Sequence, residues 1–416
     1  MSVRVVIGSL TVLIVTALIV LSLPMLGFLA ETTPWLRNPL AWQQVPAAAK
    51  CHSSPVESPM QAAAEQACQA LLAHQARLHA PSVSAAIAID GEVVWSAAAG
   101  WADLAADQPA TPATLYRIGS TSKPVTGTLL ARMVDAGLVE LDEPIETYDQ
   151  APPNPEWGQL TLRQLASHTA GLPEYETNQD LRGLYQSMAL NRRHTDVRDG
   201  LALFDGSPLR YSPGSGFEYS SFGTHLMAAT LQSAGKQPFA QLLQQQVLQA
   251  LALSSPVADR ETPARARFYQ INGDMAQPWR DVDLSSKLPG GGFMSNPTDL
   301  VKLAAAWLDP EFIREDTRAL FWTPQTLDSG DINPQSYALT WRWNSTDRYA
   351  HHGGVSKGSM AWLAVYPDES LVVALTMNTT IPNFADFSSL QTELVRLFGS
   401  AYNAGGDTRF SVRNDQ

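Results

Sequence analysis

The chain has 416 residues, of which 45% are hydrophobic and 11 are tryptophans, enough for a large buried core. Charged residues make up 16%, below the roughly 25% of an average globular protein, and 40 Asp and Glu residues outnumber 28 Lys and Arg residues. This acidic sequence contains no basic run and no basic patch interleaved with aromatic residues, so nucleic acid is excluded as an expected partner.

The N-terminal segment is apolar. Residues 5–30 contain no charged residue, and a bilayer needs only about 20 residues to be crossed. We therefore expect a short tail at 1–4 and a transmembrane anchor at 5–30, with everything after it exported. The alternative is a cleaved signal peptide, whose apolar region is normally about 7–15 residues long. A cut after Ala30 would also place bulky Phe28 where a small residue is preferred.

Residues 31–60 are rich in Pro, Ala, Gln and Ser and are predicted to be a linker. Cys51 in this segment and nearby Cys68 are the two cysteines of the chain. In an exported domain they could pair, closing a loop worth about 3 kcal/mol in the chain-entropy model. The alternative is two unpaired thiols. Because no second cysteine or histidine pair has the spacing of zinc ligands, we expect no metal site, and we expect no cofactor.

Two strand pairs lie far apart in the sequence. A helix is predicted over residues 60–79, and two alternating apolar runs joined by an Asp-Gly pair follow over residues 83–95. An Asp-Gly pair between such runs is a strong hairpin signal. A second pair of runs occurs over residues 360–366 and 371–377, with a Pro-Asp turn between them. We expect both pairs to share one antiparallel sheet.

The rest of the chain is mainly helical. Residues 120–310 are predicted to form a helical lobe, and a helix over 388–398 is expected to cover the sheet. Residues 401–416 are polar and are predicted to be a disordered tail. The folded domain is therefore expected over 61–400, as an α/β (α+β) fold with an antiparallel sheet flanked by helices.

Between the strand pairs, a serine and a lysine stand three residues apart at the predicted first turn of a helix. Apolar residues at helical spacing follow, from Val125 to Val134, and Gly137 offers a C-terminal stop. Side chains at this separation lie on one helix face, so Ser120 and Lys123 would be neighbours. A serine needs a nearby base to become a nucleophile, and a lysine can be that base. Taken alone, the pair also fits an ordinary serine cap followed by a surface lysine.

Three further segments accompany this pair: residues 165–173 (LASHTAGLP), 213–223 (PGSGFEYSSFG) and 351–354 (HHGG). In this order and spacing, with residues 117–123 (RIGSTSK), the set resembles the serine β-lactamase-like and penicillin-binding hydrolases of the class C type. The resemblance covers about residues 80–400, and its details are most similar to the mitochondrial serine β-lactamase-like branch and its bacterial relatives. It implies a β-lactamase/transpeptidase-like fold and a serine hydrolase that acts on a peptide, amide or ester.

The resemblance also assigns roles to individual residues. It makes Ser120 the nucleophile, with Lys123 and Tyr219 as proton-transfer groups, and leaves open which of the two is the acylation base. The family's Lys-Thr-Gly motif matches His351-His352-Gly353, whose strand should line the substrate groove. The N–H groups of Gly354 and Ser120 would then form the oxyanion hole.

Two departures from the family pattern concern substrate recognition. Ser221 stands where the family usually has Asn, which replaces a two-donor amide by a short hydroxyl. His351 stands where a lysine would pair the carboxylate of a β-lactam, and an unperturbed histidine, with a pKa of about 6.5, is only about a quarter protonated at pH 7. Both changes leave the acyl-transfer groups in place, so we expect β-lactams to be poor substrates at best.

Other functions and motifs compete with this hypothesis. A peptidoglycan DD-peptidase or β-lactamase is one alternative, and a catalytically idle binding or assembly module is another; the oligomeric state stays open. Residues 354–358 (GVSKG) fit the nucleophile elbow of another hydrolase fold, but a strand pattern follows and no histidine occurs after His352, so we expect a turn. Residues 290–292 (GGG) lack the ending of a phosphate loop and are expected to form a tight turn. His168 is expected to be structural.

Overall fold

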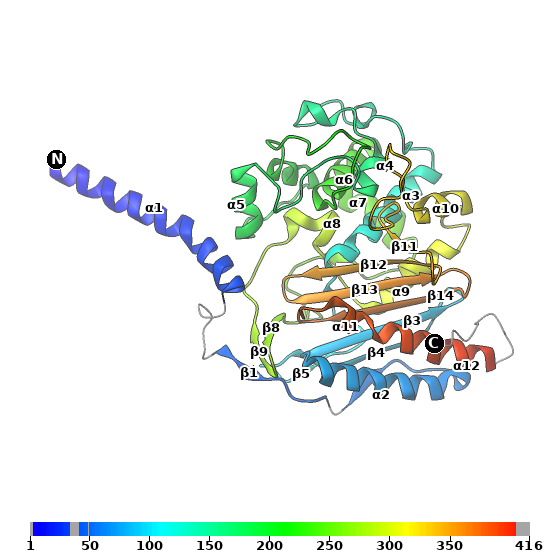
Figure 1. Ribbon diagram of the computed structural model, residues 1–416. Coiled ribbons are helices and arrows are strands. Elements are labelled where there is room, and N and C mark those ends of the chain that lie inside the picture. Colours follow the sequence, from blue (N-terminus) through cyan, green and yellow to red (C-terminus); the bar gives the residue numbers. More distant parts are fainter. Residues whose placement is uncertain (1–2, 34–40, 49, 405–416) are drawn as a thin grey trace.

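The computed structural model describes residues 3–33, 41–48 and 50–404. An eight-stranded antiparallel sheet has the order β11-β12-β13-β14-β3-β4-β2, with β5 paired to β4 (Figure 1). Helices α2 and α12 cover one face, and a mainly helical lobe packs on the other. The strands are β2 (Cys51–Ser53), β3 (Ser82–Ile89), β4 (Glu92–Asp103), β5 (Gln108–Pro109), β11 (Arg342–Asn344), β12 (Tyr349–Ser356), β13 (Ser359–Tyr366) and β14 (Leu371–Met377).

The two predicted strand pairs share this sheet, as expected. β14 pairs with β3 in antiparallel register, from Leu371 opposite Ile89 to Met377 opposite Val83. The turn between β3 and β4 has positive φ at both Asp90 and Gly91, which is what a tight two-residue hairpin turn requires. Both faces of β3, β13 and β14 are buried, because helices cover the sheet on both sides.

The helices on the outer face are α2 (Gln61–Leu78), α11 (Phe384–Ser388) and α12 (Leu390–Ala404). The helix predicted over 60–79 is therefore confirmed, whereas the C-terminal helix is longer than predicted. Residues 401–404 continue α12 instead of belonging to the tail, because Tyr402 packs against the apolar layer and its hydroxyl donates to the Asp90 carboxylate. The remainder of the predicted tail, 405–416, lies outside the described residues.

The predicted linker at 31–60 is partly built into the fold. β1 (Gln43–Gln44) pairs with β9 (Met275–Pro278), and β2 pairs with β4. Cys51 in β2 and Cys68 in α2 form a disulfide that joins the edge of the sheet to the helix above it. Residues 34–40 and 49 of this segment lie outside the described residues.

Removing this disulfide by Cys68→Ala is expected to lower the free energy of unfolding by about 3 kcal/mol, because the bond restricts the unfolded chain over a short loop. Urea unfolding of the variant beside the native protein measures the change, and a reductant added to the native protein should reproduce it. Equal unfolding midpoints with and without the reductant would contradict this expectation.

The lobe on the inner face is mainly helical, as predicted for 120–310, but it also contains short strands. Its helices are α3 (Ser122–Asp135), α4 (Leu162–Ser167), α5 (Leu181–Ala189), α6 (Ser221–Gly235), α7 (Phe239–Leu243), α8 (Leu288–Gly291), α9 (Pro297–Ala305) and α10 (Glu315–Trp322). Two three-stranded sheets, β1-β9-β8 and β6-β10-β7, lie beside them. Their further strands are β6 (Tyr116–Arg117), β7 (Val257–Ala258), β8 (Tyr269–Asn272), β9 (Met275–Pro278) and β10 (Phe293–Ser295).

The N-terminal helix α1 (Val3–Thr32) contains the predicted anchor and projects away from the domain (Figure 1). Its segment Val12–Glu31 has a mean hydropathy of 2.6 and is long and apolar enough to cross a membrane. A signal sequence would meet the same two criteria. The far end of α1 extends from the domain, while its C-terminal end contacts α5.

Candidate active site

Ser120 and Lys123 lie side by side where the inner lobe meets the sheet. Ser120 is in the 3₁₀ turn η4 (Gly119–Thr121), and Lys123 is in the first turn of α3, fully buried. The Lys123 Nζ is 3.4 Å from the Ser120 Oγ. Pro124 is tolerated at this place because the backbone N–H groups of a first helical turn have no partner within the helix.

The Lys123 amine has two further acceptors from other segments. Its Nζ donates to the Ser221 Oγ at 3.1 Å and to the carbonyl oxygen of Gly290 at 3.0 Å. Ser221 is the first residue of α6, and Gly290 lies in α8. Three separate segments therefore surround one amine. All three hydrogen bonds are made inside the protein, as expected for a buried polar group.

Ser221 connects Lys123 to two residues that follow the LASHTAGLP segment directly. The Ser221 N–H donates to a carboxylate oxygen of Glu174, and the Ser221 side chain hydrogen-bonds the Tyr175 side chain. Burial raises the pKa of Glu174 and raises the pKa of Tyr175 well above its usual value. The Ser221 hydroxyl is thus held between Lys123 and a phenol that stays protonated at neutral pH.

Tyr219 presents its ring to the lysine. The Lys123 Nζ lies 4.6 Å from the ring centroid, and the guanidinium carbon of Arg342 lies 5.2 Å from it. Among the described residues the buried Tyr219 hydroxyl has no hydrogen-bond partner. His168 packs 4.3 Å from the same ring and accepts the Ser220 N–H on its Nδ1 at 3.1 Å. His168 therefore has the structural place that was expected of its loop.

The two histidines of the HHGG segment point to opposite faces of β12, since successive side chains of a strand alternate. His351 packs on the outer face, 4.9 Å from the ring of Trp362. His352 points to the inner face, where its Nε2 lies 2.9 Å from the hydroxyl of Tyr337 and 3.3 Å from Arg342. The structure therefore corrects the predicted register by one residue: His352, not His351, lies on the side of Lys123.

The partial positive charge expected for His351 at pH 7 is also wrong. Burial, followed by the charge of Arg342, lowers the pKa of His351 to about 3, and the same causes hold the pKa of His352 well below its usual value. Both rings are neutral at pH 7. The Nδ1 of His352 lies 2.7 Å from the carbonyl oxygen of Gly353, which fits an Nδ1–H tautomer that accepts from Arg342 on Nε2. Arg342 thus carries the positive charge at this point.

The two glycines after the histidines also lie on opposite faces. A Cβ on Gly354 would lie 1.9 Å from the carbonyl oxygen of Ile118 and 2.8 Å from the nitrogen of Thr121, so only glycine lets β12 approach the Ser120 turn this closely. A Cβ on Gly353 would instead meet the ring of Phe384 on the outer face. Gly354 therefore packs against the Ser120 turn, while a side chain at Gly353 would point to the opposite face of the sheet.

The main chain of Val355 faces the nucleophile. Trp343 donates its N–H to Ser336 and not to its β12 partner Ala350. Because hydrogen-bonded and non-hydrogen-bonded pairs alternate in an antiparallel ladder, the neighbouring residue His351 directs its backbone N–H and C=O toward β11. By alternation, Gly353 and Val355 direct theirs to the same edge, beyond the end of β11. A Cβ on Gly119 would lie 2.7 Å from the Val355 nitrogen. The β12 main chain that packs against the Ser120 turn at Gly119 is thus that of Val355, one residue after the predicted Gly354.

Ser120 opens into a cleft of about 350 Å³. Its lining includes two cations that the sequence did not single out, Lys287 and Lys357. The Lys287 Nζ lies 3.8 Å from the ring centroid of Tyr175. The other lining residues are Ser120, Tyr175, Ser221, Trp279, Leu284, Gly290, Gly291, Val355, Ser356 and Thr380. Within the described part of the chain, no group of three or more His, Cys, Asp or Glu side chains could hold a metal ion.

Comparison with known proteins assigns this constellation. A family model described as Beta-lactamase matches residues 64–394. The chain belongs to the β-lactamase family. It is 27% identical over 396 aligned residues to the human (Homo sapiens) mitochondrial serine β-lactamase-like protein LACTB, covering 73% of this chain and 71% of the relative. Both the superfamily and the LACTB branch predicted from the motifs are therefore confirmed, as is a serine hydrolase of this family.

Solved structures of low sequence identity share the fold. The D-amino acid amidase of Ochrobactrum anthropi SV3, complexed with L-phenylalanine amide, superposes with a TM-score of 0.67 at 22% identity, covering 83% of this chain and all of that one. The β-lactamase/D-alanine carboxypeptidase of Pseudomonas syringae gives 0.65 at 19% identity, covering 80% and 98%. The predicted fold class of the family, an antiparallel sheet flanked by helices with a helical lobe, is confirmed.

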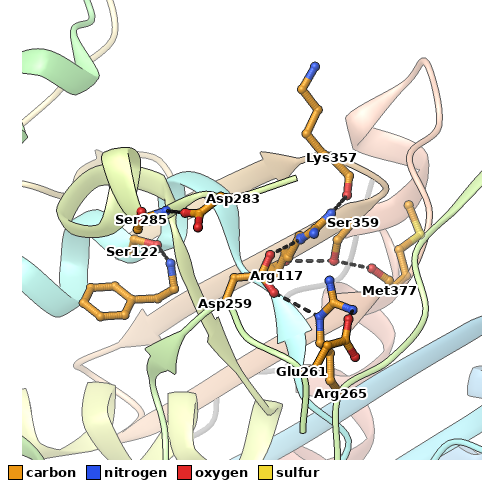
Figure 2. Close-up of polar contacts among 11 residues, drawn as sticks. Arg117, Ser122, Asp259, Glu261, Arg265, Asp283, Ser285, Lys357, Ser359 and Met377 are labelled. Atoms are coloured by element: carbon orange, nitrogen blue, oxygen red, sulfur yellow. Dashed lines mark hydrogen bonds and ion pairs between the residues drawn. The ribbon is translucent and has the colours of Figure 1, made fainter. Parts of the chain in front are cut away.

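In this β-lactamase-family site, a buried arginine just before the Ser120 turn anchors it to neighbouring segments. Arg117 donates to Asp259 at 2.6 Å and to the carbonyl oxygen of Lys357 at 2.7 Å, while the Ser359 hydroxyl donates to the Arg117 carbonyl oxygen (Figure 2). Arg265 completes the ion pairing of Asp259 at 3.0 Å. The network ties β6 to the β12–β13 turn, and Figure 2 shows the Lys357 amine pointing away from it.

Several members of the site had only weak signals in the sequence. Glu174 and Tyr175 directly follow a motif segment, so their neighbourhood was marked although their roles were not. The GVSKG segment is a turn, as predicted, with β12 ending at Ser356 and β13 beginning at Ser359, yet it also lines the cleft. Gly290 lies in the short helix α8, where a tight turn was expected, and its carbonyl oxygen accepts a hydrogen bond from Lys123. Lys287 follows no recognisable pattern.

Proposed function

We propose that this chain is a membrane-anchored serine hydrolase of peptides, amides or esters that acts through an acyl-enzyme on Ser120. One observation carries the proposal: the Ser120 hydroxyl lies at the cleft, 3.4 Å from a fully buried lysine amine that also contacts Ser221. A serine hydroxyl becomes a nucleophile when an adjacent base removes its proton. Among the described residues, Lys123 is the one basic side chain that hydrogen-bonds the Ser120 hydroxyl.

In the acylation step, Lys123 accepts the Ser120 proton while the Ser120 oxygen forms a bond to the substrate carbonyl carbon. The carbonyl oxygen becomes an oxyanion, which the N–H groups of Ser120 and Val355 stabilise; one such donor is typically worth about 2.7–4 kcal/mol. The Lys123 ammonium then gives a proton to Ser221, which gives its own to the leaving nitrogen or oxygen. The carbon–leaving-group bond breaks and the acyl group stays on Ser120.

Deacylation repeats this chemistry with water. Water attacks the acyl carbon, its proton passes to Lys123, and the Ser120 oxygen leaves and is reprotonated. Tyr175 and Glu174 hold Ser221 in place through its hydroxyl and its N–H during both steps. The D-amino acid amidase among the structural neighbours, which was solved in complex with an amide, supports amides as a substrate class for this chain.

Membrane attachment and export are part of the proposal. The anchor rests on the length and hydropathy of Val12–Glu31, and the disulfide between Cys51 and Cys68 is typical of an oxidising compartment outside the cytoplasm. Glu31, at the end of the apolar segment, is buried and ion-paired with Arg280 and Lys357. These contacts support an uncleaved α1, because cleavage after Ala30 would put a new ammonium group beside two cations.

The test is turnover of an aryl ester, a D-alanyl amide and a chromogenic cephalosporin by the purified full-length protein, beside Ser120→Ala. We expect turnover of the ester or the amide, little of the cephalosporin, and none by the variant. Fast cephalosporin turnover would favour a β-lactamase, and a stable adduct with a fluorescent penicillin would favour a peptidoglycan peptidase. Equal rates for the native protein and Ser120→Ala would refute the proposal.

The role of Tyr219 can be separated into its ring and its hydroxyl. We expect Tyr219→Phe to keep kcat within about tenfold of the native value, because its ring still faces the Lys123 amine. Tyr219→Ala loses this cation–π contact, and we expect the activation free energy to rise by the worth of the contact, about 2 kcal/mol. Steady-state kinetics on the aryl ester measures both. A loss of more than about a hundredfold in Tyr219→Phe would instead show that the phenol transfers the proton.

Lys287 predicts a pH dependence for anionic substrates. Burial, followed by the charge of Lys357, lowers the pKa of Lys287 to about 8, so its charge is present below that pH and is lost above it. For an ester bearing a carboxylate, we expect KM to rise about tenfold as pH rises through this pKa, the loss of one charge-assisted hydrogen bond. The profile should be flat for a neutral ester, and flat for both in Lys287→Met. A rise that persists in Lys287→Met would contradict this role.

A further inference from the structure

The end of the apolar helix docks on the catalytic domain. Glu31 is 8% exposed, and its carboxylate accepts from Arg280 and, at 2.7 Å, from the Lys357 Nζ. The ring centroid of Phe28 lies 5.6 Å from the same Nζ. A Cβ on Gly27 would lie 3.3 Å from the Arg280 side chain, so the last turns of α1 are packed against the domain.

These contacts are made to the wall of the cleft. Lys357 and Trp279 both line the cleft with Ser120. Arg280, which is ion-paired with Glu31, directly follows Trp279 in the sequence. Arg280 also donates to the carbonyl oxygens of Met188 and Ala189 at the end of α5. One residue, Lys357, thus joins the membrane helix on one side to the cleft on the other.

The bilayer surface is fixed by the same segment. Glu31 is the first charged residue after Arg4, so the hydrocarbon region ends close to it on the side of the domain. Helix α5 contacts α1, and it begins with Leu181, which is 80% exposed, beside exposed Arg182. An exposed apolar residue next to a cation fits the interface between lipid tails and headgroups. Figure 1 shows α1 leaving the domain on the side of α5 and α8, the helix that carries Gly290 of the cleft.

We propose that the cleft opens at the membrane surface and takes amphiphilic substrates: esters or amides whose apolar chain stays in the bilayer while the scissile acyl group and an adjacent anionic group enter the cleft. The inference rests on the proposed hydrolase function. Lys287, in the cleft wall, supplies the charge for the anionic group, and Lys357 is held at the rim by Glu31. The acyl carbon then meets Ser120 without the chain having to leave the lipid.

The test uses the full-length protein reconstituted in vesicles of phosphatidylcholine and phosphatidylglycerol. Two fluorogenic substrates carry the same acetyl ester of a sulfonated hydroxycoumarin, one with a hexadecyl tail that holds it in the bilayer and one without a tail. Rates are divided by the amount of fluorophosphonate-reactive protein on the outer surface. Glu31→Gln removes the carboxylate at the docking point, and Glu92→Gln, an exposed position on β4, is the matched control.

We expect the tailed ester to be turned over at least about tenfold faster than the tailless one, because both enzyme and substrate are confined to one surface. Glu31→Gln should lower this ratio at least about fivefold, a typical coupling between two sites, and leave the rate on the tailless ester unchanged. Glu92→Gln should behave like the native protein. Turnover of the tailless ester without an advantage for the tailed one, or an unchanged ratio in Glu31→Gln, overturns the inference alone. No turnover of either ester and no fluorophosphonate labelling overturn the proposed function with it.

Discussion

Lys123→Met is expected to lower kcat/KM on the aryl ester by about a thousandfold, within the range of general-base catalysis. The amine is the base in contact with the Ser120 hydroxyl, and it also feeds the Ser221 relay. Methionine has nearly the same length and no proton acceptor of comparable strength. Methionine also brings no charge that would need a buried partner, so we expect the fold to persist.

Lys302→Met is the matched control, since Lys302 lies exposed on α9. It should keep the native kcat/KM and the native melting temperature. If Lys123→Met folds and retains kcat/KM within about tenfold of the native value, the assignment of Lys123 as base is wrong.

Gly354→Ala is expected to have the second large effect, a loss of at least about a hundredfold in kcat, which is what a displacement of about 1 Å can cost. The added Cβ would lie 1.9 Å from the Ile118 carbonyl oxygen and 2.8 Å from the Thr121 nitrogen. Both are backbone atoms that flank the Ser120 turn, so either β12 or the nucleophile must shift. The Val355 N–H would shift with the strand.

Gly353→Ala is the comparison, because its Cβ would meet the side chain of Phe384, which can move, on the outer face of the sheet. We expect a smaller loss of kcat there, and circular dichroism should show that both variants are folded. Equal losses in the two variants would contradict the face assignment of β12.

The sequence predicted the parts of the site that depend on local spacing. Ser120 and Lys123 are brought together by one helical turn, and the hairpin around Asp90-Gly91 follows from its turn residues. The adjacent placement of that hairpin and the β13–β14 pair also follows, because apolar runs with buried faces need a common sheet. These features need no knowledge of the rest of the fold.

The register of β12 could not be obtained in the same way. His351 and His352 are followed by two glycines, so the motif fits in two positions one residue apart, and a one-residue shift exchanges the two faces of a strand. What decides between them is the turn at Ile118 and Thr121, which leaves no room for a Cβ at position 354. That contact joins segments more than 200 residues apart.

The charge of the cleft is likewise a tertiary property. Lys287 and Lys357 line the cleft from two separate segments, and no motif marks either of them as a substrate-binding cation. A histidine in solution has a pKa of about 6.5, but burial keeps both His351 and His352 neutral. The docking of Glu31 on Arg280 and Lys357 depends on how α1 leaves the domain, which no local pattern records.

Mapping a covalent adduct shows whether Ser120 is the nucleophile. The full-length protein is treated with a fluorophosphonate, digested, and analysed by mass spectrometry. We expect one adduct, on the Ser120 hydroxyl, that forms far more slowly in Lys123→Met and is absent in Ser120→Ala. An adduct on another serine, such as Ser221 or Ser356, or undiminished labelling of Ser120→Ala, would contradict it.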